Sequence, residues 1–546
     1  MFPTVQLKSA FAWAELSSIP GLPLPEGHDP LNAYQTAMDL VPHVVWLGTN
    51  IGERYQEAKN IKHLASSAAA LAITARRYDL ALEWLEQGRA VVWSQMLQLR
   101  SPLDDLAAVD PSLAANMRQV ATELFNASSG FKANVSLKPQ DEATQQHHRL
   151  AEKYQELVAA VRKLPGFNNF LKPAKISALS RAAQTGPLIV LNVDDSRCDA
   201  LVIRPGTEEI AHIPLPDLSL GVLSLIRAEL EASLSMNHVR ERGIVLKSRP
   251  KEKHDDRFEH VLSTLWTCIT KPVLDVLGYK PIVENLPQIT WCTTGDLSFL
   301  PLHASGYYDR PLAKLSDYAI SSYTPTLDAL LSAILSSPDV HRGVLAVAQE
   351  STPRKSQLPG TKVELANIRK HVPESLVYSQ LDGYSATSQA VLSAMEHHDW
   401  VHLACHAHQN TELPTKSGFF LHEGTLSLEQ IARISFKNKG LAFLSACQTA
   451  TGDKELPDEA VHLACGMLMA GYSSVIATMW SIVDEDAPLI ADEVYARLLK
   501  GGRMDARGAA RALHLAVCRL RDEVGDRAFS RWVPYIHMGG YAAHDH

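Results

Sequence analysis

Hydrophobic and polar positions recur with two different periods along this chain, and the change between them divides it. From residue 31 to about residue 180 the pattern is almost continuously helical and rich in strong helix formers. A break between two helices is expected near Tyr78 and Asp79. Small and apolar residues let the paired helices approach closely, and these are Ala68, Ala72, Ala81, Leu82, Leu85 and Gly88.

This texture is typical of helix–turn–helix units of about 34 residues, as in a tetratricopeptide-like solenoid. Only one unit is evident, so it either caps the next domain or ends an array that begins upstream. A generic helical bundle is the alternative. The polar segment 127–146 is the expected linker, and a helix over 147–163 follows it.

From Gly186 the pattern changes to short strand-like runs. PLIVLNV, CDALVIRP and EIAHIPLP are separated by turn residues, which predicts a meander. Helices are expected over 218–234 and 256–277, followed by the strand QITWCTTG. The segment YAISSYTPTLDALLSAIL predicts a strand that leads into a helix.

A second stretch, from Gly343, alternates strands with helices. The predicted strands are GVLAVAQE, DWVHLACHA, GLAFLSAC and SSVIATMWSI. The predicted helices are LPGTKVELANIRKHV, SQAVLSAMEHH, DEAVHLACGMLMAGY and APLIADEVYARLLKG, with SGFFLHEGTLSLEQI as a hairpin. This alternation predicts an α/β fold, with a mostly parallel sheet covered by helices on both faces.

Composition narrows the class of protein. A length of 546 residues allows three to four domains, and 60 acidic against 52 basic residues give a net charge of −8. That charge gives no support to nucleic-acid or membrane-surface binding. Seven cysteines without a C-x-x-C pair indicate a reduced, cytoplasmic protein rather than a disulfide or zinc framework. No signal peptide is expected, and the apolar stretch 462–480 divides into a helix and a strand.

Two successive predicted strands each end in a residue that can carry chemistry. The first delivers His406 and the second delivers Cys447, whereas the common phosphate-loop, dinucleotide, zinc-protease and serine-hydrolase motifs are absent. In open α/β sheets the carboxyl ends of the strands form the ligand-binding crevice. Neighbouring parallel strands lie about 4.8 Å apart, so two such side chains come within or near hydrogen-bonding reach.

A histidine beside a cysteine can generate the thiolate that attacks a carbonyl group. The backbone N–H groups of Ala407 and Cys447 are candidates for holding the resulting oxyanion. A structural role remains the alternative for both residues, since cysteines are often buried. Cys405 and Cys465 are expected in the core, His402 within its strand, and His408 in a loop.

The motifs HLACHA and LSACQTATGD, about 40 residues apart, and then DEAVHLACGMLMAGYSSVIATMWSIVDED resemble the CHAT domain family. CTTGDLSFLPLHASG, SSYTPTLDALL and WVPYIHMGGY resemble further family segments in the same order. The run LEWLEQGRAVVWSQMLQLRSPL is similar to helices that precede CHAT domains in fungal proteins. The family belongs to the caspase and separase clan of cysteine peptidases and is commonly fused to tetratricopeptide repeats.

The resemblance implies a caspase-like fold in three parts. These are a helical region over 1–180, a degenerate N-terminal half over 184–335 and an active half over 340–546. It also implies His406 as general base and Cys447 as nucleophile. Ala407 stands where relatives usually have Gly.

The stretch WSIVDED resembles separases, in which an acidic residue recognises a basic side chain before the cleaved bond. The resemblance implies this role for Asp484. The alternative is that Asp484 or Asp486 caps the helix that starts near Ala487 and Pro488.

The leading hypothesis is a cytoplasmic cysteine endopeptidase of protein substrates, whose helical region binds a partner or regulates the protease. No metal or organic cofactor is implied, and neither nucleic acid nor a membrane is an expected partner. A catalytically silent scaffold with a caspase-like fold is the second hypothesis. An amidase or acyl-transfer enzyme that uses the same two residues is the third.

Overall fold

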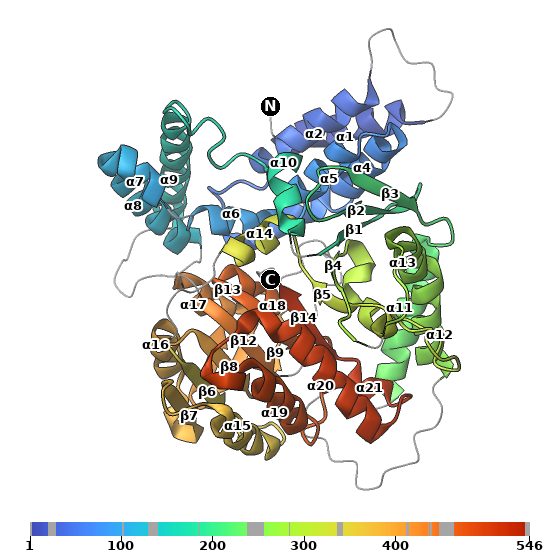
Figure 1. Ribbon diagram of the computed structural model, residues 1–546. Coiled ribbons are helices and arrows are strands. Elements are labelled where there is room, and N and C mark those ends of the chain that lie inside the picture. Colours follow the sequence, from blue (N-terminus) through green and yellow to red (C-terminus); the bar gives the residue numbers. More distant parts are fainter. Residues whose placement is uncertain are drawn as a thin grey trace. The chain divides into compact units, whose positions relative to one another are not determined.

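The computed structural model describes residues 3–19, 29–100, 103–128, 140–184, 186–236, 256–282, 284–335, 342–410, 414–434, 436, 439–446 and 463–540. The chain divides into two compact units, Met1–Lys175 and Ile176–His546. Figure 1 labels most of their helices and strands.

Helices are the regular secondary structure of the first unit, within its described residues. Its α-helices are α1 (Pro3–Ser17), α2 (Pro30–Val44), α3 (Ile51–Ala58), α4 (Leu64–Thr74), α5 (Tyr78–Gln87), α6 (Val91–Gln98), α7 (Asp104–Val109), α8 (Pro111–Ser128) and α9 (Gln140–Val161). The predicted break before Tyr78 is confirmed, because α4 ends at Thr74 and the left-handed Arg76 (φ 59°) lies between the helices. Helices α4 and α5 pack against each other through the small residues Ala68, Ala72 and Ala81, which are fully buried.

The expected linker over 127–146 is wrong at both ends. Helix α8 continues to Ser128, and α9 already begins at Gln140; residues 129–139 lie outside the described part. The segment that opens α9 is polar but holds Gln, Glu and Ala, which are good helix formers. Polarity alone therefore did not separate a linker from a solvated helix.

An 11-stranded sheet organises the second unit. In spatial order its strands are β3 (Ile210–Pro214), β2 (Cys198–Ile203), β1 (Leu188–Val193), β4 (Gln288–Cys292), β5 (Ile320–Tyr323), β14 (Tyr535–Gly539), β13 (Tyr472–Thr478), β12 (Lys439–Ser445), β8 (Trp400–Ala404), β6 (Val344–Ala348) and β7 (Tyr378–Asp382). Neighbours are parallel except for β3–β2, β2–β1 and β14–β13.

Helices cover both faces of this sheet. They are α10 (Ile176–Leu179), α11 (Leu220–Met236), α12 (Asp256–Leu265), α13 (Lys271–Leu277), α14 (Leu327–Leu335), α15 (Gly360–His371), α16 (Ser388–His397), α17 (Leu428–Arg433), α18 (Leu463–Met469), α19 (Ala487–Leu498), α20 (Ala509–Val524) and α21 (Phe529–Trp532). Helices α15, α19 and α20 pack in a row on one face, while α14 and α18 pack together on the other (Figure 1). Strands β6, β8 and β12 are buried along their whole length, as two covered faces require. The predicted fold class is confirmed.

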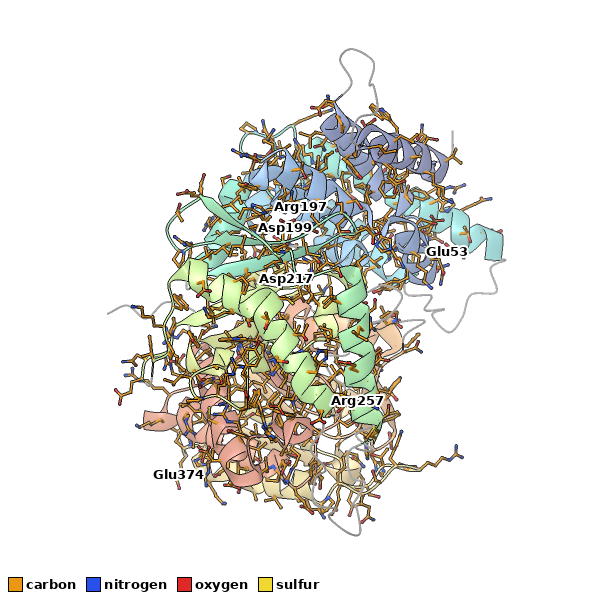
Figure 2. The ribbon with its side chains drawn as sticks, turned by 90° about the vertical axis from the view of Figure 1, so that its right-hand side faces the viewer. Glu53, Arg197, Asp199, Asp217, Arg257 and Glu374 are labelled. Carbon is orange, nitrogen blue, oxygen red and sulfur yellow. The ribbon has the colours of Figure 1, made fainter. Side chains whose placement is uncertain are left out.

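The predicted meander is also confirmed, as the antiparallel strands β1, β2 and β3. Asp199 of β2 is fully buried and accepts two hydrogen bonds of 2.7 Å from the Arg197 guanidinium. His212 of β3 lies 2.6 Å from the same carboxylate. Arg197 and Asp199 are labelled in Figure 2. Because a buried carboxylate needs partners, these contacts bind the edge strand to its neighbour.

Strand β14 occupies the middle of the sheet, between β5 of the N-terminal part and β13 of the C-terminal part. His537 on this strand is buried, and its two ring nitrogens lie 2.7 Å from Ser322 Oγ and 2.8 Å from Ser474 Oγ. One imidazole therefore connects three strands across the junction.

A small antiparallel sheet follows the carboxyl end of β8. Its strands are β9 (Ala407–His408), β10 (Gly418–Leu421) and β11 (Gly424–Ser427). The expected hairpin is confirmed as β10 and β11, but its last residues belong to α17, which Ser427 and Gln430 start with a capping box.

Candidate active site

The two strands that were predicted to lead to His406 and Cys447 are neighbours in the sheet. Strands β8 and β12 pair in parallel, and the last matched residues are Ala404 and Ser445. His406 follows Ala404 by two positions, and Cys447 follows Ser445 by two positions. Cys447 itself lies outside the described residues.

His406 is held by backbone groups. Its side chain is almost completely buried, and its Nε2 lies 2.8 Å from the carbonyl oxygen of Ser356. A carbonyl oxygen only accepts hydrogen bonds, so Nε2 carries the hydrogen and Nδ1 presents its lone pair. The His406 carbonyl accepts a 2.8 Å hydrogen bond from the Phe420 N–H. The first contact leaves Nδ1 of the ring suited to accepting a proton, and the second holds the backbone that carries the ring.

Ala407 has a backbone conformation that suits an alanine. It lies in β9 opposite Phe419 and is absent from the residues with a positive φ. The hydrogen bond from Phe420 to His406 makes the adjoining pair, Ala407 with Phe419, a non-hydrogen-bonded pair of the ladder. The Ala407 N–H therefore points away from β10, and the Cβ causes no strain.

Asp484 is 8% exposed, and its Oδ2 accepts a 2.6 Å hydrogen bond from the N–H of Gly360, the first residue of α15. The negative carboxylate at a helix N-terminus is favourable. Four residues before Gly360 stands Ser356, which binds His406. Asp484 thus anchors the loop that orients the histidine.

The alternative role for Asp484 or Asp486, as the cap of α19, is wrong, because α19 has no side-chain capping hydrogen bond. Asp486 occupies the N-cap position but makes no capping hydrogen bond. Its carboxylate pairs with Arg531 instead, accepting hydrogen bonds from Arg531 Nε at 2.8 Å and from Arg531 Nη2. The carboxylate is therefore turned from its own helix toward α21, whereas Pro488 does lie in the first turn of α19 as expected.

Two further histidines, His402 and His408, lie before and after His406 in the sequence. His402 lies within β8 as expected, fully buried, with its Nε2 3.0 Å from Oε2 of the equally buried Glu364 of α15. His408 was expected in a loop but is a half-buried residue of β9, where burial lowers its pKa. The sequence showed a strand ending at His406 and gave no sign of the two-residue strand that follows it.

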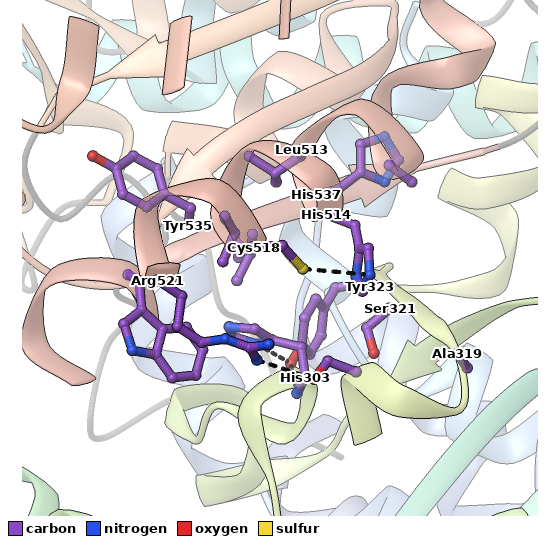
Figure 3. A pocket seen from close by; sticks show the side chains of 15 residues that line it. His303, Ala319, Ser321, Tyr323, Leu513, His514, Cys518, Arg521, Tyr535 and His537 are labelled. Carbon is purple, nitrogen blue, oxygen red and sulfur yellow. Dashed lines mark hydrogen bonds between the residues drawn. The ribbon is translucent and has the colours of Figure 1, made fainter. Parts of the chain in front are cut away.

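Among the described cysteines, Cys405 and Cys465 are buried as predicted. Cys518 is partly exposed and lies 3.8 Å from His514 Nε2 on α20, in a pocket between α20, β5 and β14 (Figure 3). Burial raises the pKa of Cys518 and lowers that of His514 to about 4. Cys518 is therefore a neutral thiol beside a neutral imidazole, and a neutral thiol is a poor nucleophile.

The described part of the chain contains no group of three or more His, Cys, Asp or Glu residues arranged to hold a metal ion. Within the same part, no helix is both long enough and apolar enough to cross a membrane.

Comparison with known proteins gives one family match. The family model described as CHAT domain matches residues 259–540, more than half of the chain. No curated protein matches the chain.

Among solved structures, the chain is similar to the Saccharomyces cerevisiae separase–securin complex, with 9% identity and a TM-score of 0.47 over 92% of this chain and 42% of that one. It is also similar to the complex of the Porphyromonas gingivalis RgpB pro- and mature domains, with 9% identity and a TM-score of 0.37 over 53% of this chain and 76% of that one. A third similar structure is that of the Arg-specific cysteine proteinase gingipain R, with 11% identity and a TM-score of 0.38 over 50% of this chain and 68% of that one. The chain thus spans less than half of the separase chain.

Proposed function

The chain belongs to the CHAT family, and from this premise we propose that it is a cysteine endopeptidase of the caspase and separase clan. One observation carries the proposal. The parallel register of β8 and β12 ends at Ala404 and Ser445, so the proposed base and nucleophile follow equivalent positions on neighbouring strands. Such strand ends are where open α/β sheets bind ligands.

In the proposed reaction, His406 Nδ1 takes the thiol proton of Cys447, and the thiolate adds to the scissile carbonyl carbon. The N–H groups of Ala407 and Cys447 stabilise the oxyanion. When the C–N bond breaks, His406 returns the proton to the leaving amine. Water then attacks the thioester, with His406 as general base, and releases the acid and the thiol.

The Ser356 carbonyl supports this role for His406. It fixes the hydrogen on Nε2 by a 2.8 Å hydrogen bond and stabilises the imidazolium that forms during the reaction. Ser356 contributes only a backbone group, so its side chain carries no part of the proposal.

We propose Asp484 as the residue that recognises a basic side chain before the cleaved bond. Its link through Gly360 to the loop that holds His406 supports a position close to the reaction. Asp484→Asn keeps an oxygen acceptor for Gly360 but removes the charge. If the proposal holds, this variant loses selectivity for Arg and Lys over Leu while its unfolding midpoint changes little.

We assign residues 184–335 to a degenerate half and 340–546 to the active half, with the helical unit as the site of a regulatory protein partner. The six described cysteines are all free thiols, which supports a reducing compartment such as the cytoplasm.

Intact-mass spectrometry with peptidyl acyloxymethyl ketones tests the proposal. We expect one adduct on the wild type, no adduct on Cys447→Ala, and an unchanged adduct on Cys518→Ala, which removes the one described cysteine that is partly exposed. Probes with Arg or Lys beside the warhead should react fastest. An adduct that persists in Cys447→Ala, or none at all, would favour the silent scaffold.

A further inference from the structure

The 11-stranded sheet has two edge strands, β3 and β7, and they differ in how the edge is protected (Figure 1). Strand β3 ends in Pro214, and proline is one of the residues that keep an edge from pairing with another chain. Strand β7 contains neither proline nor lysine, and it pairs with β6 along its whole length without a bulge. Strand β7 is therefore an edge that can accept a further strand.

Two residues of β7 hold its open backbone groups. The Val377 carbonyl accepts a hydrogen bond from β6, so the backbone groups of Val377 point toward that strand. Backbone groups point to alternate sides along a strand, so those of Tyr378 and Gln380 point away from β6. Asp382 also points outward, but its N–H and its carbonyl both bind the Ser385 hydroxyl. Within the described residues, the N–H and C=O groups of Tyr378 and Gln380 thus form the open part of this edge.

The sequence around these groups is symmetric about Ser379. The five residues centred on it read Val-Tyr-Ser-Gln-Leu, in which two apolar residues flank two hydrogen-bonding ones. When two copies pair antiparallel about Ser379, Tyr378 of each copy lies opposite Gln380 of the other, and each such pair exchanges both of its backbone hydrogen bonds. Val377, which is 59% exposed, then lies opposite the partly exposed Leu381 of the other copy. The same pairing therefore covers apolar surface and satisfies the open backbone groups.

The charged residues at this edge are also complementary to themselves. The Arg369 guanidinium of α15 lies 5.0 Å from the centroid of the Tyr378 ring. Asp382 Oδ2 accepts a 2.8 Å hydrogen bond from Gln380 Nε2, on the same face of the strand. In the symmetric pairing, Asp382 is the diagonal neighbour of Tyr378 in the other copy, at about 7–8 Å, a distance that long side chains span. Each Arg369 can therefore pair with Asp382 of the other copy, and this complementarity indicates a second copy as the partner.

We propose that β7 is a dimerisation edge, at which two copies of this chain pair their β7 strands antiparallel about Ser379 and join their two sheets into one. An edge of this length gives a small interface, so we expect a reversible dimer with a Kd of roughly 1–100 μM. The inference concerns assembly alone and does not depend on the proposed peptidase activity.

Sedimentation velocity of the full chain, over about 1–200 μM, measures the dimer. The Gln380 N–H does not bind β6, so Gln380→Pro keeps the hydrogen bonds of the sheet and removes an open donor. Gln380→Ala is the matched control, because it loses the same side-chain contacts but keeps the N–H. We expect Gln380→Pro to raise the Kd at least about tenfold relative to Gln380→Ala. Urea unfolding should give the two variants similar midpoints, since neither breaks the pairing of β7 with β6.

An exchange of charges tests the symmetry of the pairing. In Arg369→Glu both ion pairs become repulsive, and the same holds for Asp382→Lys, so each variant alone should dimerise about tenfold more weakly than the wild type. A mixed dimer of one copy of each variant again has opposite charges in both pairs. An equimolar mixture should therefore form mixed dimers, which native mass spectrometry resolves, with a Kd within about threefold of the wild type. Lys370→Glu is the matched control, because Lys370 is the next exposed residue of α15 and contacts Asn367 of its own helix; it should keep the wild-type Kd.

Three results would overturn the dimerisation edge. The first is a full chain that stays monomeric over the whole concentration range. The second is a dimer that Gln380→Pro weakens no more than Gln380→Ala does, which would place the contact elsewhere on the molecule. The third is a mixture of Arg369→Glu and Asp382→Lys that dimerises no better than either variant alone. Labelling of Cys447 is measured separately, so a monomeric chain that forms the Cys447 adduct removes the dimer and leaves the peptidase proposal intact.

Discussion

Gly360→Ala tests the contact between Asp484 and the loop that orients His406. A Cβ built on Gly360 would lie 2.8 Å from Asp484 Oδ2 and much closer than van der Waals contact to the Asp484 carbonyl oxygen. Gly360 has no positive φ, so the backbone itself accepts alanine. The substitution therefore changes only the space available to Asp484.

The expected size follows from two opposing terms. Overpacking costs about 1–3 kcal/mol, whereas replacing a glycine by alanine in a helix contributes about 0.5–1 kcal/mol of stability. The difference is a net loss of up to about 2.5 kcal/mol, with about 1 kcal/mol at the middle of the two ranges. Gly221→Ala is the matched control, since Gly221 is the exposed second residue of α11 and its Cβ would meet only Ser219 Oγ at 3.7 Å. This control should gain stability.

Urea unfolding measures both variants, and the rate of adduct formation on Cys447 measures the effect on the site. Displacing the Gly360 end of the loop moves the Ser356 carbonyl away from His406, so we expect labelling to slow by about 10- to 100-fold. A Gly360→Ala protein that is as stable as Gly221→Ala and reacts at the wild-type rate would refute the proposed link.

Two further predictions concern buried histidines. Burial lowers the pKa of His537 from 6.5 to about 3, so the unfolded chain takes up a proton between those pH values that the folded chain does not. The stability that neutral His537 contributes is complete above pH 6.5 and falls with the pH, by about 2 kcal/mol at pH 5. Urea unfolding of His537→Gln should therefore show a smaller loss of stability than the wild type between pH 7.5 and pH 5. Glu364→Gln should lower the free energy of unfolding by about 1–3 kcal/mol in the same assay. The amide keeps the volume of the side chain but loses the carboxylate beside His402, and both residues are fully buried. The exposed Glu374→Gln should stay within about 0.5 kcal/mol of the wild type, and equal midpoints for the two glutamate variants would contradict the role of the buried pair.

Strands were predictable from the sequence where burial on both faces left a plain signal. The runs that became β6, β8, β12 and β13 are short and apolar, and each appears where the pattern places it. Strand β7, Tyr378–Asp382, is half-exposed and carries polar residues, so it has no such run. Helix α20, Ala509–Val524, does carry apolar residues at helical spacing and was within reach of the same reasoning.

The contacts around His406 were not predictable in the same way. The histidine was identified because it follows a strand, but its partner Ser356 contributes only a carbonyl oxygen, which every residue has. The contact of Asp484 with Gly360 joins residues 124 positions apart, and their pairing depends on how α15 and α19 pack. Local pattern predicts the elements of this site, whereas its hydrogen bonds depend on tertiary structure.

The position of β14 has a consequence for how the protein is made. Ser322 on β5 and His537 on β14 are 215 residues apart, so a ribosome that adds about 5–20 residues per second needs roughly 10–40 s between them. Until then β5 presents the unpaired N–H and C=O groups of a strand that ends up in the interior of a sheet. The nascent chain thus passes through a period in which β5 is an open sheet edge, and a chaperone that covers β5 until β14 emerges would protect the chain from pairing with another copy.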